Sequence, residues 1–306
     1  MSKNRTHITR VTAATQHDGN GKKNGSHHSH RVKPCLILIG GHEDKEDDKI
    51  ILREVARRVG SGKLVVTTVA SHDPGGLFEK YQSVFHELGV KHVEKLEIET
   101  RDEARDPRTV EKIADAMGIF FTGGDQLRIT SQIGDTPTYE KMRELHQRGV
   151  VIAGTSAGAS VVCETMLVAG DGRESHRIDE SLKMAPGLGF VPGMIVDQHF
   201  AERGRLGRLL GAVAHNPAML GIGIDEDTAI IVEDNQFSVL GSGAIYVIDA
   251  REVSYSNIAD ATLGQTLSVH HLILHTLVHG ECFDLHERRP CKASVAVAAT
   301  APAKRD

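Results

Sequence analysis

The sequence has no tryptophan, and phenylalanine and tyrosine together make up only 4% of its 306 residues. A core for a chain of this length must therefore be built mainly from aliphatic side chains. Long apolar runs are also missing, since stretches such as 35–39 and 150–153 are far shorter than the roughly 20 residues of a membrane span. The first 30 residues contain no apolar signal core. We therefore expect neither a membrane association nor secretion by that route.

Cysteine is scarce as well. The four cysteines, at positions 35, 163, 282 and 291, form no CxxC pair, which argues against a zinc site or a disulfide framework. This pattern is typical of proteins from a reducing compartment, so we expect a cytoplasmic location. The remaining composition, with 40% hydrophobic and 25% charged residues, is that of a globular protein.

Charge is distributed unevenly along the chain. Residues 1–33 carry seven Lys or Arg and one Asp, so a total charge of −5 leaves −11 on the other 273 residues. The basic segment is rich in Gly, Asn, Ser and His and has no aromatic residue, which predicts a disordered, solvated tail; a nucleic-acid-binding arm is the alternative. The acidic remainder suits a cationic substrate better than a nucleic acid, so we expect no nucleic-acid partner.

From residue 34 onward, short β-rich apolar runs alternate with amphipathic segments. The alternation predicts an α/β fold with a mainly parallel sheet and helices on both faces, because parallel strands need crossover connections. The expected strands are 35–39, 63–70, 92–98, 119–122, 150–153, 194–197 and 221–224. The expected helices are 47–59, 77–88, 107–117, 138–148, 157–166 and 202–215.

The pattern changes after Asp225. Three short strand-like runs, 229–232, 237–240 and 244–248, are separated by turn residues and predict a C-terminal β-meander. The segment 263–278 is compatible with a last helix or a strand. On a helix, His271, His275 and His279 would share one face, and we interpret them as a solvated stripe rather than metal ligands. We expect one α/β domain over residues 34–285, flanked by tails at 1–33 and 286–306.

The strongest local signal is the sequence Gly154-Thr-Ser156-Ala-Gly158, which lies between an expected buried strand and an expected helix. This G-x-S-x-G pattern in a strand–turn–helix context is typical of a nucleophile elbow, in which the serine hydroxyl is exposed on a strained turn. Ser156 is therefore the candidate nucleophile. Ser160, one helical turn later, is interpreted as a packing residue.

A serine nucleophile needs a base, and the base needs an orienting carboxylate. Among 18 histidines, His199 directly follows a predicted strand, at the end of a parallel sheet where active sites gather. Glu174, in the polar loop 170–179, and Glu226, just past another strand, compete as the orienting acid. Sequence spacing alone does not choose between them.

Two further polar groups follow predicted strands. The Gly123-Gly124 loop lacks the spacing of a phosphate-binding loop, but its backbone N–H groups could hold an oxyanion, together with that of Ala157. Arginines at 203, 205 and 208 could clamp substrate carboxylates, and Asp197 or Glu202 could receive a cationic group; exposed helix arginines are the plainer interpretation.

Five ordered motifs together resemble the peptidase E-like serine peptidase family, from about residue 34 to about 280. They are Ile39-Gly-Gly-x-Glu-Asp-Lys45, Phe121-Thr-Gly-Gly-Asp-Gln126, Gly154-Thr-Ser-Ala-Gly-Ala-Ser160, Asp197-Gln-His-Phe-x-x-Arg-x-Arg-x-x-Arg208 and Gly223-Ile-Asp-Glu226. His42 departs from the family pattern, which usually has a small residue there. Because its loop does not carry the nucleophile, we expect little consequence.

The resemblance implies a class I glutamine amidotransferase-like (flavodoxin-like) fold, a homodimer and a serine-type exopeptidase that needs no metal, nucleotide or organic cofactor. The implied substrate is cyanophycin, a poly-aspartate backbone with arginine joined to each side chain, and the implied product is the β-Asp-Arg dipeptide. A dipeptidase for short Asp-X peptides and a non-catalytic binding protein on the same fold are the alternatives.

Carried over residue by residue, the resemblance assigns Ser156 as nucleophile and His199 as base. By its place in the sequence Gly172-Arg-Glu174-Ser, Glu174 matches the acid of the triad. The residues that match the substrate pocket are Gln126, Asp197, Gln198, Arg203, Arg205 and Arg208.

Overall fold

The computed structural model describes residues 33–71, 73–170, 182–260, 262 and 264–292. The chain divides into two units, Met1–Arg31 and Val32–Asp306, and all described residues belong to the second. The expected tail at 1–33 lies outside the described residues except for Lys33.

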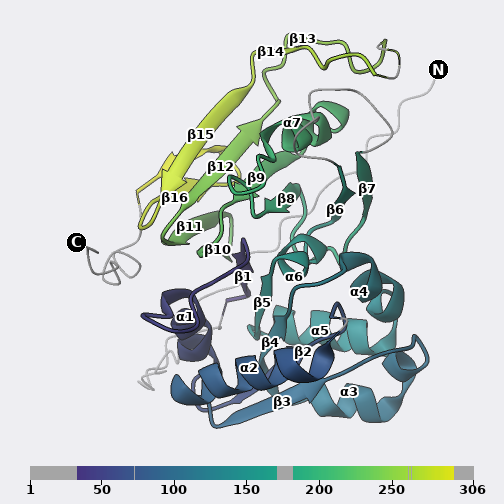
Figure 1. Ribbon diagram of the computed structural model, residues 1–306, viewed down its shortest axis with the longest axis vertical. Coiled ribbons are helices and arrows are strands. Elements are labelled where there is room, and N and C mark those ends of the chain that lie inside the picture. The colour runs from purple at the N-terminus through teal and green to yellow at the C-terminus, as the bar shows by residue number, and fades with distance from the viewer. Residues whose placement is uncertain (1–32, 72, 171–181, 261, 263, 293–306) are drawn as a thin grey trace, which may run out of the picture. The chain divides into compact units, whose positions relative to one another are not determined.

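A nine-stranded sheet forms the centre of this unit, in the order β17-β16-β11-β10-β1-β5-β4-β2-β3 (Figure 1). The five strands from β1 to β3 in this order pair in parallel, as the alternation of strand and helix predicts. Their bounds are β1 Cys35–Ile39, β5 Val151–Thr155, β4 Ala116–Phe121, β2 Lys63–Thr67 and β3 His92–Leu96.

Helices cover both faces of the parallel strands. Along β1, Ile37 and Ile39 pack with α1 (Ile50–Val59) and α2 (Pro74–Glu87), whereas Leu36 and Leu38 pack with the opposite layer. Because side chains alternate between faces along a strand, a continuous apolar run is what burial on both faces requires. The opposite layer contains α3 Pro107–Ile113, α4 Gln126–Ile133, α5 Pro137–Gln147 and α6 Ala157–Val161, with a short 3₁₀ turn at Glu103–Arg105.

The sheet continues through four antiparallel strands, β10 Thr228–Glu233, β11 Gln236–Gly241, β16 Cys282–Asp284 and β17 Arg289–Cys291. A second sheet has the order β15-β12-β9-β8, with bounds β15 Ile273–Val278, β12 Ala244–Asp249, β9 Leu220–Ile224 and β8 Met194–Gln198. The last helix, α7 Leu206–His215, packs on β9 and β12.

The expected C-terminal meander differs from the observed pairing. Strands β10 and β11 form a hairpin in the first sheet, but β12 pairs with β9 and β15 in the second sheet. The connection passes through Gly241, whose φ of 133° lies in a region that residues with a side chain rarely adopt. A Cβ there would lie 2.3 Å from the carbonyl oxygen of Asp227, so glycine allows this close crossing between the sheets.

Several boundaries were also wrong. The helix expected over 157–166 ends at Val161, and a small hairpin of β6 (Thr165–Ala169) and β7 (Lys183–Pro186) follows. The histidines expected on a helix lie in and beside β15, and β13 (Tyr255–Ser256) pairs with β14 (Val269–His270) upstream. Residues four apart on a strand are about 13 Å apart, so His271, His275 and His279 do not form a compact metal face.

The C-terminal end corrects two further expectations. Cys282 and Cys291 form a disulfide across the β16–β17 pair, contrary to the expectation of a chain without disulfides. The four cysteines have no motif spacing, and only the antiparallel pairing of these short strands brings this pair together. Strand β17 also lies beyond residue 285, where the flexible tail was expected to begin. Among the residues described, no helix is long and apolar enough to cross a membrane.

Candidate active site

Ser156 lies on a sharp turn between β5 and α6, at the carboxyl end of the parallel strands. Its backbone has φ 54° and ψ −115°, a combination that non-glycine residues adopt only under strain. The Ser156 amide donates to the carbonyl of Ile39 at the end of the neighbouring strand β1, at 3.0 Å. This anchored turn leaves the serine side chain half-buried rather than enclosed.

The two glycines of the G-x-S-x-G sequence are required by close backbone packing. A Cβ on Gly154 would lie 2.2 Å from the carbonyl oxygen of Gly158, and a Cβ on Gly158 would lie 2.3 Å from that of Phe121. Both contacts are with backbone atoms, which cannot move aside without disturbing α6 and β4. The glycines therefore allow the strand, the turn and the short helix to approach closely.

His199 follows β8 and faces Ser156. The Ser156 Oγ lies 2.9 Å from His199 Nε2, which is hydrogen-bonding distance. The His199 amide donates to the carbonyl of Gly40 at 2.8 Å, so the last residue of β1 and the residue after it anchor the two members of the pair. A Cβ on Gly41 would lie only 2.2 Å from His199 Cε1, so this glycine leaves the space that the imidazole occupies.

The other ring nitrogen of His199 contacts Glu226, the alternative acid that the sequence left open. His199 Nδ1 lies 2.6 Å from Glu226 Oε1, in the loop between β9 and β10. Glu174, the acid that the resemblance assigned, lies outside the described residues. The described chain thus brings together a hydroxyl, an imidazole and a carboxylate in the order of a catalytic triad.

His42 binds the second oxygen of the same carboxylate. Its Nδ1 lies 2.7 Å from Glu226 Oε2, and its ring meets that of His199 edge-on, with the centroids 5.2 Å apart. The side chain of His42 is 72% exposed, whereas that of Glu226 is 24% exposed. The departure from the family motif at His42 therefore contacts the triad, contrary to the expectation that it has little consequence.

The environment shifts the pKa of both ionisable partners. Burial lowers the pKa of His199 below its ordinary value, opposed by its hydrogen bond to Glu226 and reinforced by the positive charge of Arg203 and by His42. Burial alone would raise the pKa of Glu226, but the hydrogen bonds from His42 and His199 outweigh it and lower the pKa. A neutral imidazole beside an ionised carboxylate is the pair that a general base requires at neutral pH.

This shift predicts a pH profile. A neutral His199 is the active form, so kcat/KM should rise with pH through its pKa, with a midpoint below the ordinary histidine value of 6.5. Arg203→Gln removes a positive charge that lowers this pKa, so the midpoint should move to higher pH. Rates measured across the pH range, with EDTA present to remove stray metal ions, test this. Arg108→Gln, which removes a positive charge on α3, is the control and should leave the midpoint unchanged. A midpoint unmoved in Arg203→Gln would contradict it.

The Gly123-Gly124 loop lies beside the nucleophile. A Cβ on Gly123 would lie 3.3 Å from Ser156 Cβ and 3.8 Å from its Oγ. Gly124 has φ 141°, and a Cβ there would lie 2.1 Å from the carbonyl oxygen of Ala70, so only glycine fits. Within the described part of the chain, no hydrogen bond engages the amides of Gly124 and Ala157. Backbone donors are therefore available next to Ser156.

Five of the six residues matched to the substrate pocket lie around β8 and α7, and Gln126 lies at the start of α4. Four of the six bind one another. Asp197 is completely buried and pairs with both Arg205, at 3.2 Å, and Arg208, whose Nε lies 2.9 Å away. Arg205 also donates to the side-chain oxygen of Gln198 at 2.8 Å. Asp197 thus supplies the countercharge for Arg205 and Arg208, which differs from the expectation that it receives a cationic group of the substrate.

Gln126 and Arg203 complete this group in different ways. Gln126 is buried, and its amide donates to the carbonyl of Leu167 at 2.7 Å. Arg203 is exposed in the turn after His199, as is Glu202. Of the predicted pocket residues, Arg203 therefore has the side chain most accessible to a ligand.

The buried cluster predicts a stability effect. Asp197→Asn would leave Arg205 and Arg208 as buried cations without a countercharge, so the free energy of unfolding should fall by about 3 kcal/mol or more. Denaturant titration of the purified protein measures this. Glu144→Gln, in a half-exposed ion-pair set with Lys141 and Arg148, is the matched control and should change stability little. Equal losses in both variants would contradict the prediction.

A second buried carboxylate lies behind the nucleophile turn and was missed as a site residue. Glu43 accepts hydrogen bonds from Thr155 at 2.6 Å and from Tyr81 at 2.5 Å, and Lys45 lies 2.8 Å away. Thr155 directly precedes Ser156, so this network fixes the end of β5. The Gly-Gly-x-Glu-Asp-Lys motif was the available signal.

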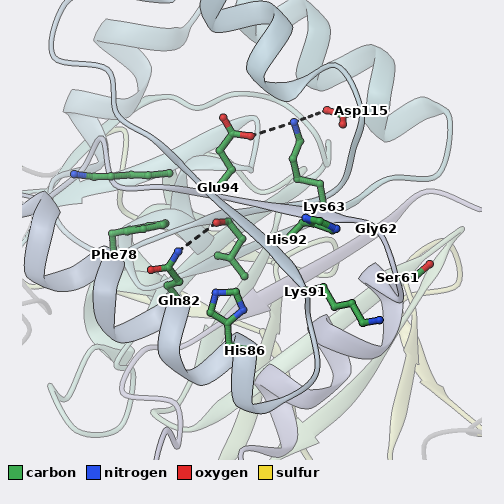
Figure 2. A pocket seen from close by; sticks show the side chains of 12 residues that line it. Ser61, Gly62, Lys63, Phe78, Gln82, His86, Lys91, His92, Glu94 and Asp115 are labelled. Atoms are coloured by element: carbon green, nitrogen blue, oxygen red, sulfur yellow. Dashed lines mark hydrogen bonds and ion pairs between the residues drawn. The ribbon is translucent and has the colours of Figure 1, made fainter.

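A separate pocket lies at the β3 edge of the first sheet (Figure 2). Figure 2 shows Lys63 between Glu94 and Asp115, and Gln82 donating to the carbonyl of Val93. Its lining contains none of the predicted site residues. The predicted site residues that the structure describes therefore lie at or near the Ser156 turn and not in this pocket.

A strained serine at a strand–helix turn, with an imidazole and a carboxylate in series behind it, defines the class of the serine hydrolases. The family model described as Peptidase family S51 matches residues 36–240. The chain belongs to peptidase family S51, and it is a serine-type peptidase.

Curated relatives extend this match beyond the family model. The chain is 39% identical over 261 residues to a cyanophycinase of Nostoc sp., an alignment that covers 84% of this chain and 87% of the relative. It is 36% identical over 274 residues to a cyanophycinase of Synechococcus elongatus, covering 88% and 84%. A peptidase E of Nostoc sp. is 24% identical over 177 residues, which covers 55% of this chain and 67% of the relative.

A solved structure supports the fold. The crystal structure of a peptidase from an acI-B1 Actinobacterium matches with a TM-score of 0.62 at 20% identity, covering 83% of this chain and 98% of that one.

Proposed function

We propose that this peptidase is a cyanophycinase, an exopeptidase that hydrolyses cyanophycin to β-Asp-Arg dipeptides through an acyl-enzyme. The observation that carries the proposal is the identity of 36–39% to curated cyanophycinases over most of both chains, together with the Ser156–His199–Glu226 contacts. The proposal includes the class I glutamine amidotransferase-like assignment of the fold and a homodimer.

In the proposed reaction, His199 Nε2 takes the proton of Ser156 Oγ as this oxygen attacks a carbonyl carbon of the substrate. Glu226 accepts a hydrogen bond from Nδ1–H of His199. This bond keeps Nε2 free for the Ser156 proton and stabilises the imidazolium that forms. The amides of Gly124 and Ala157, next to Gly123, are the proposed donors to the oxyanion, and removing one such donor typically costs about 3–4 kcal/mol of transition-state stabilisation. His199 then protonates the leaving amine, and water releases the acyl group.

Substrate contacts are proposed from accessibility. Arg203 would bind a free carboxylate of the substrate, and Glu202 would receive the arginine side chain, because both are exposed beside His199. Asp197, Gln198, Arg205 and Arg208, which bind one another, would hold this turn in place, and Gln126 would fix β6 through its bond to Leu167. A cytoplasmic location stays a prediction, and the Cys282–Cys291 disulfide removes one of its reasons.

Product analysis tests this function. Purified enzyme is incubated with cyanophycin and, in parallel, with a set of Asp-X dipeptides, and the products are identified by mass spectrometry. β-Asp-Arg as the main product from the polymer supports the proposal. Cleavage of Asp-X dipeptides alone would assign the peptidase E-like alternative. A folded protein that cleaves neither substrate and is not labelled by a serine-directed fluorophosphonate would indicate a binding protein.

A further inference from the structure

His42 has no step in the proposed hydrolysis, yet it completes a cluster of three metal-ligating side chains. One ligand atom each from His42, His199 and Glu226 lies within 4.8 Å of the others. The three residues follow different strands, β1, β8 and β9, so the cluster is created by the fold and not by a local sequence motif.

We propose that these three side chains form an inhibitory site for a divalent transition-metal ion of the Zn²⁺ type. Two imidazoles and one carboxylate are a ligand set that zinc uses in proteins, with bond lengths of about 2.0–2.2 Å and a fourth position left for water. Ligand atoms around one such ion lie about 3.3 Å apart. Small side-chain rotations suffice, because each histidine Nδ1 already lies within 2.7 Å of a Glu226 oxygen.

The donor set selects the class of ion. Imidazole nitrogen favours Zn²⁺, Cu²⁺ and Ni²⁺, whereas Mg²⁺ and Ca²⁺ prefer sites made of oxygen ligands. Access is open on the side of His42, whose side chain is 72% exposed. His199 and Glu226 are already oriented by their hydrogen bonds, so the ion would enter a largely preformed site.

Inhibition follows from the chemistry of the His199 ring. In the proposed active form, Nδ1 carries the proton that bonds to Glu226, and the lone pair on Nε2 accepts the Ser156 proton. An ion bound to Nδ1 takes the position of the Nδ1 proton, so the single proton of the neutral imidazole moves through solvent to Nε2. A protonated Nε2 cannot accept the Ser156 proton, and Glu226 is occupied by the ion. Hydrolysis therefore stops without any change in the covalent structure.

Inhibition of cyanophycin hydrolysis by Zn²⁺ is the first test, and this arm rests on the proposed function. The full chain should lose activity at micromolar Zn²⁺ and regain it with EDTA. His42→Ala, compared with its own metal-free rate, should need at least about tenfold more Zn²⁺ for half-inhibition. The matched control is His286→Ala. His286 is similarly exposed and also contacts a glutamate, Glu287, but it lies outside the cluster of three ligands. This variant should keep the wild-type sensitivity, and Mg²⁺ should not inhibit.

Metal binding measured without catalysis separates the two proposals. In Ser156→Ala, Co²⁺ should give the visible absorption of a protein-bound ion. The double variant that also carries His42→Ala should lack this signal, although both proteins keep the same N-terminal histidines. Equal Zn²⁺ inhibition of the wild type and His42→Ala, or equal Co²⁺ spectra in the two backgrounds, would overturn the metal site. If cyanophycin is not cleaved but the Co²⁺ difference persists, the function fails and the site stands.

Discussion

Ser156→Ala should abolish cyanophycin hydrolysis, with kcat falling about a million-fold. In serine peptidases, loss of the nucleophile removes the covalent path and leaves only the residual acceleration from binding and the oxyanion donors. The side chain is half-buried and its backbone is anchored to Ile39, so the variant should keep its fold and still bind the polymer. Release of β-Asp-Arg from purified cyanophycin, followed over time by mass spectrometry, measures the loss.

Ser160→Ala is the matched control for this variant. Ser160 lies one helical turn after the nucleophile, is buried, and its Oγ donates to the carbonyl of Val196 at 3.3 Å. Removing this hydroxyl should leave kcat within a few-fold of the wild-type value. Full activity in Ser156→Ala, or an equal loss in both variants, would contradict the assignment of Ser156 as nucleophile.

The sequence predicted the parts of the fold that depend on local pattern. Apolar runs such as Cys35–Ile39 indicate strands buried on both faces, and helices do cover both faces of this strand. The nucleophile could be predicted for the same reason, because its elbow is a local strand–turn–helix feature. The end of one helix was wrong: 157–166 was expected to be helical, but α6 ends at Val161 and the β6–β7 pair follows.

Contacts between distant segments could not be predicted in this way. Glu226 reaches His199 because β9 pairs in parallel beside β8, which brings their carboxyl ends together. His42 reaches the same carboxylate because the loop after β1 lies against the start of β10, as the antiparallel pairing of Ile39 with Ala229 shows. The Cys282–Cys291 disulfide depends in the same way on the pairing of β16 with β17, which no sequence motif indicates. Spacing along the chain contains none of this information.

The acid that orients His199 is the site residue that spacing along the chain left open, and the structure places Glu226 there. Glu226→Gln should lower kcat about ten-thousand-fold, as expected when an amide replaces the carboxylate of a serine triad. The amide keeps the size of the side chain, but it no longer fixes the Nδ1–H tautomer of His199 or stabilises the imidazolium. Rates of cyanophycin hydrolysis at neutral pH measure the loss, and a near-wild-type free energy of unfolding confirms that the fold is kept.

Two carboxylates serve as controls for this substitution. Glu174→Gln tests the acid that the resemblance assigned, and Glu202→Gln tests a neighbouring exposed carboxylate whose Oε1 accepts from the Glu226 amide at 3.2 Å. If Glu226 orients His199, Glu174→Gln should retain most of kcat, and Glu202→Gln should alter KM more than kcat because its proposed role is to bind the substrate arginine. A ten-thousand-fold loss in Glu174→Gln with an active Glu226→Gln would reverse the assignment. The contact of 2.6 Å between His199 Nδ1 and Glu226 Oε1 favours the first outcome.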